Sequence, residues 1–316
     1  RYFLASRGLG DVYKRQEVLQ EVSVPRPVPR RGQVLVRTRF IGVNPKDVIV
    51  RKGNFKALTG KRFPIIVGHD IAGEVVEAGV GADLAPGDLV FGMINDFAGR
   101  AYAEYAAVDS QQLAKAPASI DLSVAAAAPL AAQTALQALR DDAGVQPGQK
   151  VLINGASGGV GVFAVQIAKI LGDEVTAVCS HRNVDLVAEL GTDRVIDYTA
   201  TELVELDERI DAFFDVFGNY NFDKIKHLLG PRGTYVHTIP NARIFMEVAR
   251  TFVRRKRAKI VIVKSKRDQL DWIRQQIDGG HLRVVVDRSF SLSDAADAHR
   301  YMETKRARGK VVLEVG

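Results

Sequence analysis

One stretch constrains the fold more than any other part of the chain: residues 148–169, GQKVLINGASGGVGVFAVQIAK. The apolar run at residues 150–154 follows a Pro-Gly turn and predicts a buried parallel strand. A glycine-rich turn comes next, and then apolar residues recur at helical spacing. This order places the free N–H groups of a helix N-terminus against an anion, here a dinucleotide pyrophosphate. Glycines alone are weak evidence, but the strand and helix around them support the motif.

The turn supplies most of the predicted cofactor-binding residues: Gly155, Ser157, Gly158, Gly159, Val160 and Gly161. The same stretch carries a family resemblance. The matching positions are Gly148, Gln149, Leu152, Ala156, Ser157, Gly158, Gly159, Gly161, Gln166 and Lys169. They fit the signature of the quinone oxidoreductase/zeta-crystallin family, and the chain thus resembles that group of the medium-chain dehydrogenase/reductase superfamily.

The composition is that of an ordinary globular protein, with 47% hydrophobic and 26% charged residues over 316 positions. That length is enough for two domains and a substantial core. No apolar run reaches the length that spans a membrane. The single cysteine, Cys179, excludes internal disulfides and a cysteine-rich zinc site. Few cysteines are typical of a reducing compartment, so we expect a cytoplasmic protein.

We expect residues 1–16 to be non-native. Asp11 to Gln16, DVYKRQ, matches the translation of a transposon end used in sequencing libraries. We therefore set residues 1–16 aside as an artefact at the end of an environmental contig. The natural protein is expected to begin near Glu17, without its first native strand.

Residues 17–122 are predicted to be rich in short strands joined by turns. Strand patterns occur at residues 33–41, 65–67, 73–76, 89–92 and 103–108, and turns at residues 42–47 and 86–88. Such a pattern indicates a compact β-barrel-like domain. The segments GVNPKD, FPIIVGHDIAGEVVEAG, PGDLVFG and YAEYA resemble the GroES-like catalytic domain of the superfamily.

Residues 123–266 are predicted to form the second domain. An Ala-rich helical stretch at residues 123–139 contains Pro129 as a break. From Lys150, strands are predicted at residues 150–154, 174–179, 194–197, 212–216, 233–238 and 259–263, with helices at 184–190 and 222–229. A helix is also predicted at residues 268–278. Strand–helix alternation predicts a Rossmann domain, a doubly wound parallel sheet.

By resemblance, residues 267–316 return to the first domain. The expected fold class is therefore α/β: a GroES-like β-barrel catalytic domain plus a Rossmann NADP-binding domain.

The end of the second Rossmann strand predicts the choice of cofactor. An NAD site has Asp or Glu there to bind the ribose hydroxyls. Residues 179–183 are CSHRN, with no acid before Asp185. Ser180 can donate a hydrogen bond and Arg182 can pair with a 2′-phosphate, so NADP is expected. Tyr198 matches a family position near the adenosine phosphate.

A catalytic zinc needs three protein ligands. By resemblance to alcohol dehydrogenases, the two ligand cysteines would fall at Asn44 and Leu130. Only the histidine position remains, as His69. A lone histidine is more often a hydrogen-bonded structural residue than a ligand, so we expect no metal.

Without a metal to polarise a carbonyl, hydride delivery to an already activated acceptor is favoured over alcohol–ketone chemistry. Asn44 and Thr134 are the candidate catalytic residues. Asn44 occupies a lost ligand position, and Thr134 resembles the family threonine that approaches the nicotinamide. Asp47 is expected to brace the Asn44 turn or to pair with Arg51. Several quinone reductases of the family carry a tyrosine where this chain has Ile49. Because that hydroxyl is missing here, the sequence identifies no proton donor.

The sequence therefore predicts a zinc-independent, NADPH-dependent oxidoreductase acting on a quinone, enone or enal. The alternative is an NADPH-binding, zeta-crystallin-like structural or RNA-binding protein with little turnover. An enone and quinone panel distinguishes the two.

A basic cluster, RRKRAKIVIVKSKR, extends from Arg254 to Arg267 and accounts for much of the net charge of +7. A solvated sheet edge protected by its lysines is the simplest interpretation. Peripheral contact with an anionic membrane is the second. The absence of interleaved aromatic residues in this segment argues against nucleic acid. The sequence is also compatible with a homodimer.

Overall fold

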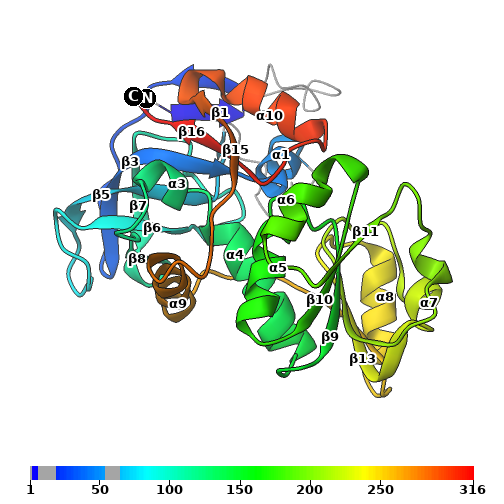
Figure 1. The fold of residues 1–316 in the computed structure, drawn as a ribbon. Helices are drawn as coiled ribbons and strands as arrows, with labels where there is room; N and C mark the ends of the chain where they lie inside the picture. Colours follow the sequence, from blue (N-terminus) through cyan, green and yellow to red (C-terminus); the bar gives the residue numbers. More distant parts are fainter. Residues whose placement is uncertain (1, 6–18, 54–64) are drawn as a thin grey trace. The chain divides into compact units, whose positions relative to one another are not determined.

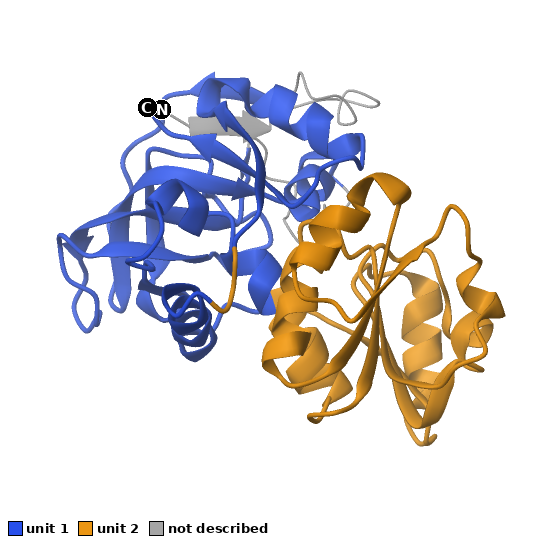
Figure 2. Ribbon diagram, in the orientation of Figure 1, with its two compact units in different colours: residues 1–133, 264–280, 284–316 blue, residues 134–263, 281–283 orange. Residues whose placement is uncertain are grey.

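The computed structural model describes residues 2–5, 19–53 and 65–316 (Figure 1). It contains two compact units (Figure 2). Unit 1 comprises residues 1–133, 264–280 and 284–316, and unit 2 comprises residues 134–263 and 281–283. The predicted border at 122/123 lies eleven residues before the division at 133/134, and that at 266/267 lies three residues after the division at 263/264. Val36 and Ile71 belong to a buried core in unit 1, and Leu152 and Phe213 belong to another in unit 2.

Unit 2 is built on a six-stranded parallel sheet. Its strands are β9 (Lys150–Asn154), β10 (Glu174–Cys179), β11 (Arg194–Asp197), β12 (Ile210–Asp215), β13 (Leu229–His237) and β14 (Arg257–Ile260). The strand order is β11-β10-β9-β12-β13-β14. This order, 3-2-1-4-5-6 in sequence terms, is that of the dinucleotide-binding Rossmann fold, and it confirms the predicted doubly wound domain.

The helices of unit 2 are α5 (Gly161–Ile170), α6 (Val184–Glu189), α7 (Phe222–Ile225) and α8 (Ala242–Thr251), and α4 (Pro129–Leu136) crosses the division between the units. Figure 1 shows α5 and α6 on one side of the sheet and α8 on the other. The predicted helix at residues 222–229 is too long, because Leu229 already begins β13. Helix α8 was not predicted from the sequence.

Unit 1 contains a mixed sheet centred on the long strand β3. Its strands are β3 (Gln33–Val43), β5 (Asp70–Ala78), β6 (Leu89–Met93), β7 (Tyr105–Asp109), β8 (Leu113–Lys115), β15 (Val286–Ser291) and β16 (Lys310–Glu314). β3 pairs antiparallel with β5, β7 and β16. Register shifts in the β3–β5 ladder mark bulges, which bend a sheet toward closure. The C-terminal strand thus joins the sheet that the N-terminal part of the chain begins.

Unit 1 also contains short helices, and most of them flank this sheet. They are α1 (Pro45–Arg51), α3 (Leu122–Ala125), α9 (Arg267–Asp278) and α10 (Ala295–Glu303). Residues 42–47, predicted as a turn, in fact include the start of α1 with Pro45 as its first residue. The break at Pro129 is confirmed, since α3 ends at Ala125 and α4 begins at Pro129. No helix within the described ranges is both long and apolar enough to cross a membrane.

A small three-stranded sheet contains β1 (Tyr2–Ala5), β2 (Leu19–Val22) and β4 (Ile65–Ile66) in the order β2-β1-β4. β1 pairs antiparallel with both neighbours, so part of the segment that the sequence led us to set aside is a strand. Backbone pairing of this kind needs no particular side chains. The predicted native start near Glu17, and most of residues 1–16, lie outside the described residues.

Candidate functional site

The glycine turn between β9 and α5 is held mainly by backbone hydrogen bonds. The N–H groups of Gly155 and Ala156 donate to the Val178 carbonyl, at 3.2 and 3.0 Å. Gly155 has φ +83°, a conformation that favours glycine. A Cβ atom on Gly161 would lie 2.1 Å from the Gly155 carbonyl oxygen. Glycine is therefore required where α5 meets the end of β9.

The start of α5 is accessible to a ligand. Residues 157–160, which include Ser157, Gly158, Gly159 and Val160, are partly exposed, whereas residues 161–168 of the helix are buried. Val160 is the N-cap residue and its side chain makes no capping hydrogen bond. The helix is ten residues long, so its N-terminal N–H groups and dipole favour an anion such as a pyrophosphate.

Two predicted serines meet beside this turn. The Asn183 Nδ2 atom donates to the Ser157 hydroxyl oxygen at 2.9 Å and to the Ser180 hydroxyl oxygen at 3.4 Å. Asn183 thus joins the glycine turn to the end of β10. Sequence reasoning missed this residue. Its position four residues after the strand, in a segment already expected to contact the cofactor, was the available signal.

The predicted 2′-phosphate contacts occur at the ends of two adjacent strands. Cys179 of β10 is in register with Asp197 of β11. Ser180 and Arg182 follow β10, and Tyr198 follows β11 with its N–H bonded to the Cys179 carbonyl. Both strand ends lie at the carboxyl edge of the sheet, where this fold binds ligands.

This edge fits NADP. Arg182 and Tyr198 are exposed. Residues 179–183 contain no carboxylate that would repel a phosphate or select the ribose hydroxyls of NAD. The residues present therefore fit NADP, which would be held by the glycine turn and by Ser180 and Arg182.

A buried carboxylate also organises this edge. Asp215, at the end of β12, accepts hydrogen bonds from Asn154 Nδ2 at 2.7 Å and from the N–H groups of Gly218 and Tyr220 at 2.8 and 2.9 Å. A Cβ on Gly155 would lie 3.3 Å from Phe217, inside the loop that Asp215 holds. Sequence reasoning did not single out Asp215, because one aspartate at a strand end has many common roles. Its function here is to fix the loop beside the glycine turn.

The two predicted catalytic residues belong to different units. Thr134 lies in α4 at the start of unit 2, with 6% of its surface exposed. Asn44 belongs to unit 1 and is 1% exposed. The approach of Thr134 to a nicotinamide stays a prediction.

The side chain of Asn44 is committed to three hydrogen bonds. Its Nδ2 donates to Asp70 Oδ2 at 2.9 Å and to the Gly42 carbonyl at 3.2 Å. Its Oδ1 accepts from the Lys310 ammonium at 2.5 Å. A ligand that bonded this amide would have to displace one of these partners. The geometry thus gives Asn44 a positioning role.

Asp70 is the centre of the buried cluster. Its Oδ1 accepts from the Leu130 N–H at 2.7 Å, and its Oδ2 lies 3.4 Å from Lys310 Nζ. One carboxylate therefore contacts both Asn44 and Leu130, the two positions of the missing ligand cysteines. Burial raises the pKa of Asp70, while Lys310 and the hydrogen bonds oppose that rise. Sequence reasoning missed both Asp70 and Lys310, whose partners are far away in the chain.

Asp47 braces the Asn44 segment, as predicted. Its Oδ2 accepts from the Asn44 N–H at 2.9 Å, and its Oδ1 lies 2.5 Å from His69 Nδ1. The predicted alternative pairing with Arg51 is wrong: Arg51 Nη2 contacts Glu303 Oε1 at 3.0 Å. His69 is hydrogen-bonded, as expected. Its Nε2 has no hydrogen-bond partner among the described residues.

A second group of polar side chains packs next to this cluster. Tyr102 Oη and His299 Nε2 lie 2.9 Å apart, and Arg51 Nη1 lies 3.4 Å from His299 Nδ1. Burial, with a further contribution from Arg51, lowers the pKa of His299 to about 4 and keeps the imidazole neutral. Burial also raises the pKa of Tyr102. These groups support α1 from the side of α10.

The residues present do not fit a catalytic zinc. Asn44 already holds an ammonium group, which would repel a divalent ion, and Leu130 offers an aliphatic side chain. Within the described part of the chain, no group of three or more His, Cys, Asp or Glu side chains could hold a metal ion.

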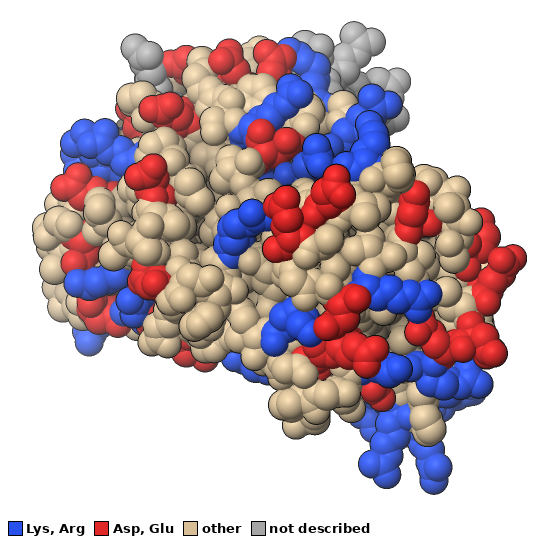
Figure 3. All heavy atoms as spheres, viewed as in Figure 1, with Lys and Arg blue, Asp and Glu red and all other residues tan. Residues whose placement is uncertain are grey.

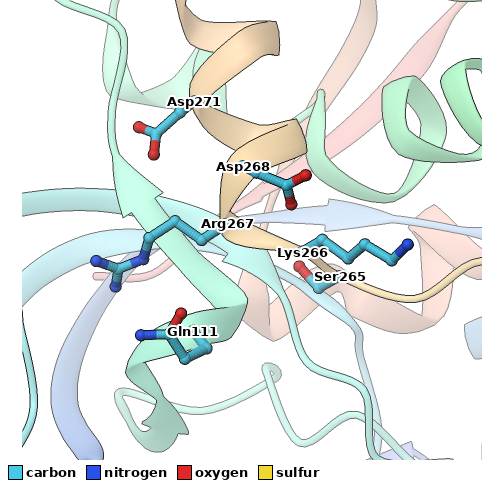
Figure 4. Close-up of a pocket in the computed structure, with 6 residues that line it drawn as sticks. All are labelled: Gln111, Ser265, Lys266, Arg267, Asp268 and Asp271. Atoms are coloured by element: carbon cyan, nitrogen blue, oxygen red, sulfur yellow. The ribbon is translucent and has the colours of Figure 1, made fainter.

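A separate surface cavity of about 510 Å³ lies elsewhere in unit 1. It is lined by Gln111, Ser265, Lys266, Arg267, Asp268 and Asp271 (Figure 4). Arg267 is held by an ion pair with Asp83 at 2.6 Å, and its side chain points away from that of Lys266. The cavity contains none of the sequence-predicted site residues and is not part of the candidate site.

Known proteins share this architecture. Residues 30–118 match the alcohol dehydrogenase GroES-like domain, and residues 190–313 match the family described as zinc-binding dehydrogenase. A chloroplastic quinone-oxidoreductase, QR1, of Triphysaria versicolor is 33% identical over 308 residues, covering 94% of each chain. A chloroplastic NADPH-dependent alkenal/one oxidoreductase of Arabidopsis thaliana is 33% identical over 310 residues, covering 93% of this chain and 75% of the relative.

The structure of the quinone oxidoreductase from Coxiella burnetii matches with a TM-score of 0.90 at 29% identity, covering 100% of this chain and 99% of that one. The fold and the glycine turn define a dinucleotide-dependent oxidoreductase of the medium-chain dehydrogenase/reductase superfamily. Within it, the chain belongs to the quinone oxidoreductase-like family.

Proposed function

We propose that this protein is an NADPH-dependent oxidoreductase that reduces quinones or α,β-unsaturated carbonyl compounds. The observation that carries the proposal is the junction of β9 and α5. There a glycine-rich turn meets a helix N-terminus, beside a β10 end, residues 179–183, that presents Ser180 and Arg182 without a carboxylate. Relatives named as a quinone-oxidoreductase and as an NADPH-dependent alkenal/one oxidoreductase support it.

When bound, NADPH supplies a hydride for an electrophilic carbon whose negative charge can delocalise onto oxygen. The chain contributes binding and orientation. The glycine turn holds the pyrophosphate, and Ser180 and Arg182 hold the 2′-phosphate. The Asp70–Lys310 pair fixes Asn44 and the segment that leads into α1. Water supplies the proton that completes reduction.

We also propose that the reaction is zinc-independent. The support is the Lys310 ammonium at the Asn44 amide and the aliphatic side chain at Leu130. Exhaustive chelation should leave activity intact, and elemental analysis should find no stoichiometric zinc. One bound zinc per chain, lost together with activity, would contradict this part of the proposal.

The decisive experiment compares a conjugated enone with its saturated ketone. NADPH oxidation should be fast with the enone and with a small quinone, because both delocalise the incoming charge, and slow with the ketone. Product identification shows whether the conjugated bond was reduced. Equal rates for enone and ketone would overturn the mechanism. No turnover of any acceptor, with NADPH binding intact, would favour the alternative of a zeta-crystallin-like structural or RNA-binding protein.

Location and assembly stay predictions. The cytoplasm is proposed because the single cysteine, Cys179, is buried and the chain forms no internal disulfide. A homodimer and a membrane contact in the segment from Arg254 to Arg267 are also proposed as testable states. Sedimentation equilibrium measures the first.

A further inference from the structure

Helix α8 and the turn after it carry an exposed apolar face. Twelve large apolar side chains are exposed among the described residues, and four of them fall within residues 245–253: Phe245, Met246, Phe252 and Val253. Phe252 is 75% exposed and Val253 is 89% exposed. Isolated exposed apolar side chains are normal, whereas such clusters mark interaction sites.

The spacing of these residues places them on one side of the helix. Positions 245, 246, 249, 252 and 253 follow the i, i+1, i+4, i+7, i+8 pattern, and Phe252 still has helical dihedral angles. The opposite side contains the buried residues Ile244, Glu247 and Thr251. Helix α8 therefore has one side buried in unit 2 and a second apolar side that faces solvent.

Cations border the exposed side. Arg243, Arg254, Arg255 and Arg257 are exposed, and Figure 3 shows Lys and Arg side chains projecting at the end of unit 2 where α8 leads into β14. Glu247, the acid within α8, is buried. The pKa of Lys256 is lowered by burial and by the nearby Arg209 cation, as expected where positive charges gather.

The structure divides the basic cluster, residues 254–267, between the two units. Arg254 to Val263 belong to unit 2, whereas Lys264 to Arg267 belong to unit 1, where Arg267 pairs with Asp83. The surface defined by α8 and residues 252–257 is called here the α8 surface.

We propose that the α8 surface docks the protein onto an anionic membrane surface. An anionic leaflet offers negative potential for the arginines and an apolar layer for Phe252 and Val253. In a symmetric contact between two copies, the same basic patch would face itself and set positive charge against positive charge. Nucleic acid would satisfy the arginines and its bases could stack on Phe252, but Met246 and Val253 would gain nothing from either phosphates or stacking.

The test uses the full chain and flotation with vesicles of phosphatidylcholine, alone or mixed with phosphatidylserine. The protein should float with the mixed vesicles only, and added salt should weaken binding. The Phe252→Ser/Val253→Ser and Arg254→Glu/Arg255→Glu variants should each lower the partition coefficient by about tenfold or more. NADPH binding should be unchanged in both, which shows that they are folded.

Matched controls come from unit 1. Val80 is 77% exposed, and Arg30 and Arg31 form an exposed basic pair. Val80→Ser repeats the Val253→Ser change, and Arg30→Glu/Arg31→Glu repeats the double charge reversal, away from the α8 surface. Both should leave vesicle binding almost unchanged. Equal losses in the control and test variants would show only a general charge effect and would overturn the proposal.

Three further results would overturn it. The first is failure to float with the mixed vesicles. The second is a dimer, seen by sedimentation equilibrium, that F252S/V253S dissociates without changing flotation. The third is retention of polyuridylate on filters without vesicle binding. None of these measurements depends on turnover, so the outcome is independent of the proposed reaction.

Discussion

The glycine turn of unit 2 and the buried polar cluster of unit 1 are built in opposite ways. The turn comes from one continuous stretch and depends on the backbone, since Gly161 is required only because any Cβ would strike the Gly155 carbonyl. The cluster brings together side chains from separate segments, among them Asn44, Asp70 and Lys310. The turn forms only where no side chain fills the space at its glycines, whereas the cluster is stable only while its buried charges balance.

This difference predicts which substitutions or protonation changes disrupt each region. A backbone-built site tolerates changes of side chain but not added volume at its glycines. A cluster of buried charges tolerates neither the loss of one partner nor a shift in protonation, because the remaining charge is left without compensation. The predictions below separate these two behaviours.

The largest effect is expected for Lys310→Met, which leaves the Asp70 carboxylate buried without its cation. The free energy of unfolding should fall by about 3–5 kcal/mol, measured by urea denaturation. The double variant Lys310→Met/Asp70→Asn should recover part of the loss. Lys150→Met is the matched control, because Lys150 and Glu174 form an exposed pair 3.8 Å apart. It should cost less than about 1 kcal/mol, and an equally small loss for Lys310→Met would contradict the charge-balance argument.

Acid should destabilise the fold through His299, which belongs to the polar group beside the cluster. Its folded pKa of about 4 lies below the unfolded value of 6.5, so the unfolded chain takes up the proton first. Stability is therefore fully present above pH 6.5 and is lost as the pH falls toward 4, by on the order of 3 kcal/mol. The measurement is urea denaturation across this range.

His299→Gln supplies the control for that measurement. The variant keeps Asp70, whose raised pKa acts in the opposite direction, and removes only the imidazole. Its stability should depend less on pH than that of the natural sequence between pH 6.5 and 4. Identical pH profiles for the two proteins would show that His299 does not titrate as its burial requires.

Gly161→Ala should break the turn. The added Cβ would lie 2.1 Å from the Gly155 carbonyl oxygen, so the backbone must move. We expect NADPH binding to weaken on the order of 100-fold, about 2.7 kcal/mol, measured by fluorescence titration. Gly230→Ala is the control in the same unit, since its nearest atom would be 3.4 Å away. Wild-type affinity in Gly161→Ala would remove the steric argument.

The smallest effect is expected for Arg182→Ala. Loss of one exposed charge-assisted contact should weaken NADPH by about tenfold and leave NADH almost unchanged. Titration of both cofactors tests this. An equal loss for the two would show that Arg182 does not contact the 2′-phosphate.

Local patterns account for what sequence reasoning predicted well. The strand, turn and helix of residues 148–169 are adjacent in the chain, so spacing alone placed them, and β9 and α5 follow. Ser180 and Arg182 were predicted from the end of the second strand and Tyr198 from a family position, and their contacts with a cofactor stay predictions. Asp70 and Lys310 were missed, since Asp70 lies 26 positions from Asn44 and Lys310 lies 266 positions from it. Asn183 was missed because its bond to Ser157 spans 26 positions.

The sequence by itself determined the Rossmann unit, its glycine turn and the absence of an acid at the end of β10, because each depends on residues close together in the chain. Only the tertiary structure showed that Asn44 is held by Asp70 and Lys310, that Arg51 pairs with Glu303, and that α8 exposes a second apolar side. These features depend on which distant segments fold against one another. The partner that each side chain contacts is a property of that packing, and the apolar pattern of a single segment does not specify it.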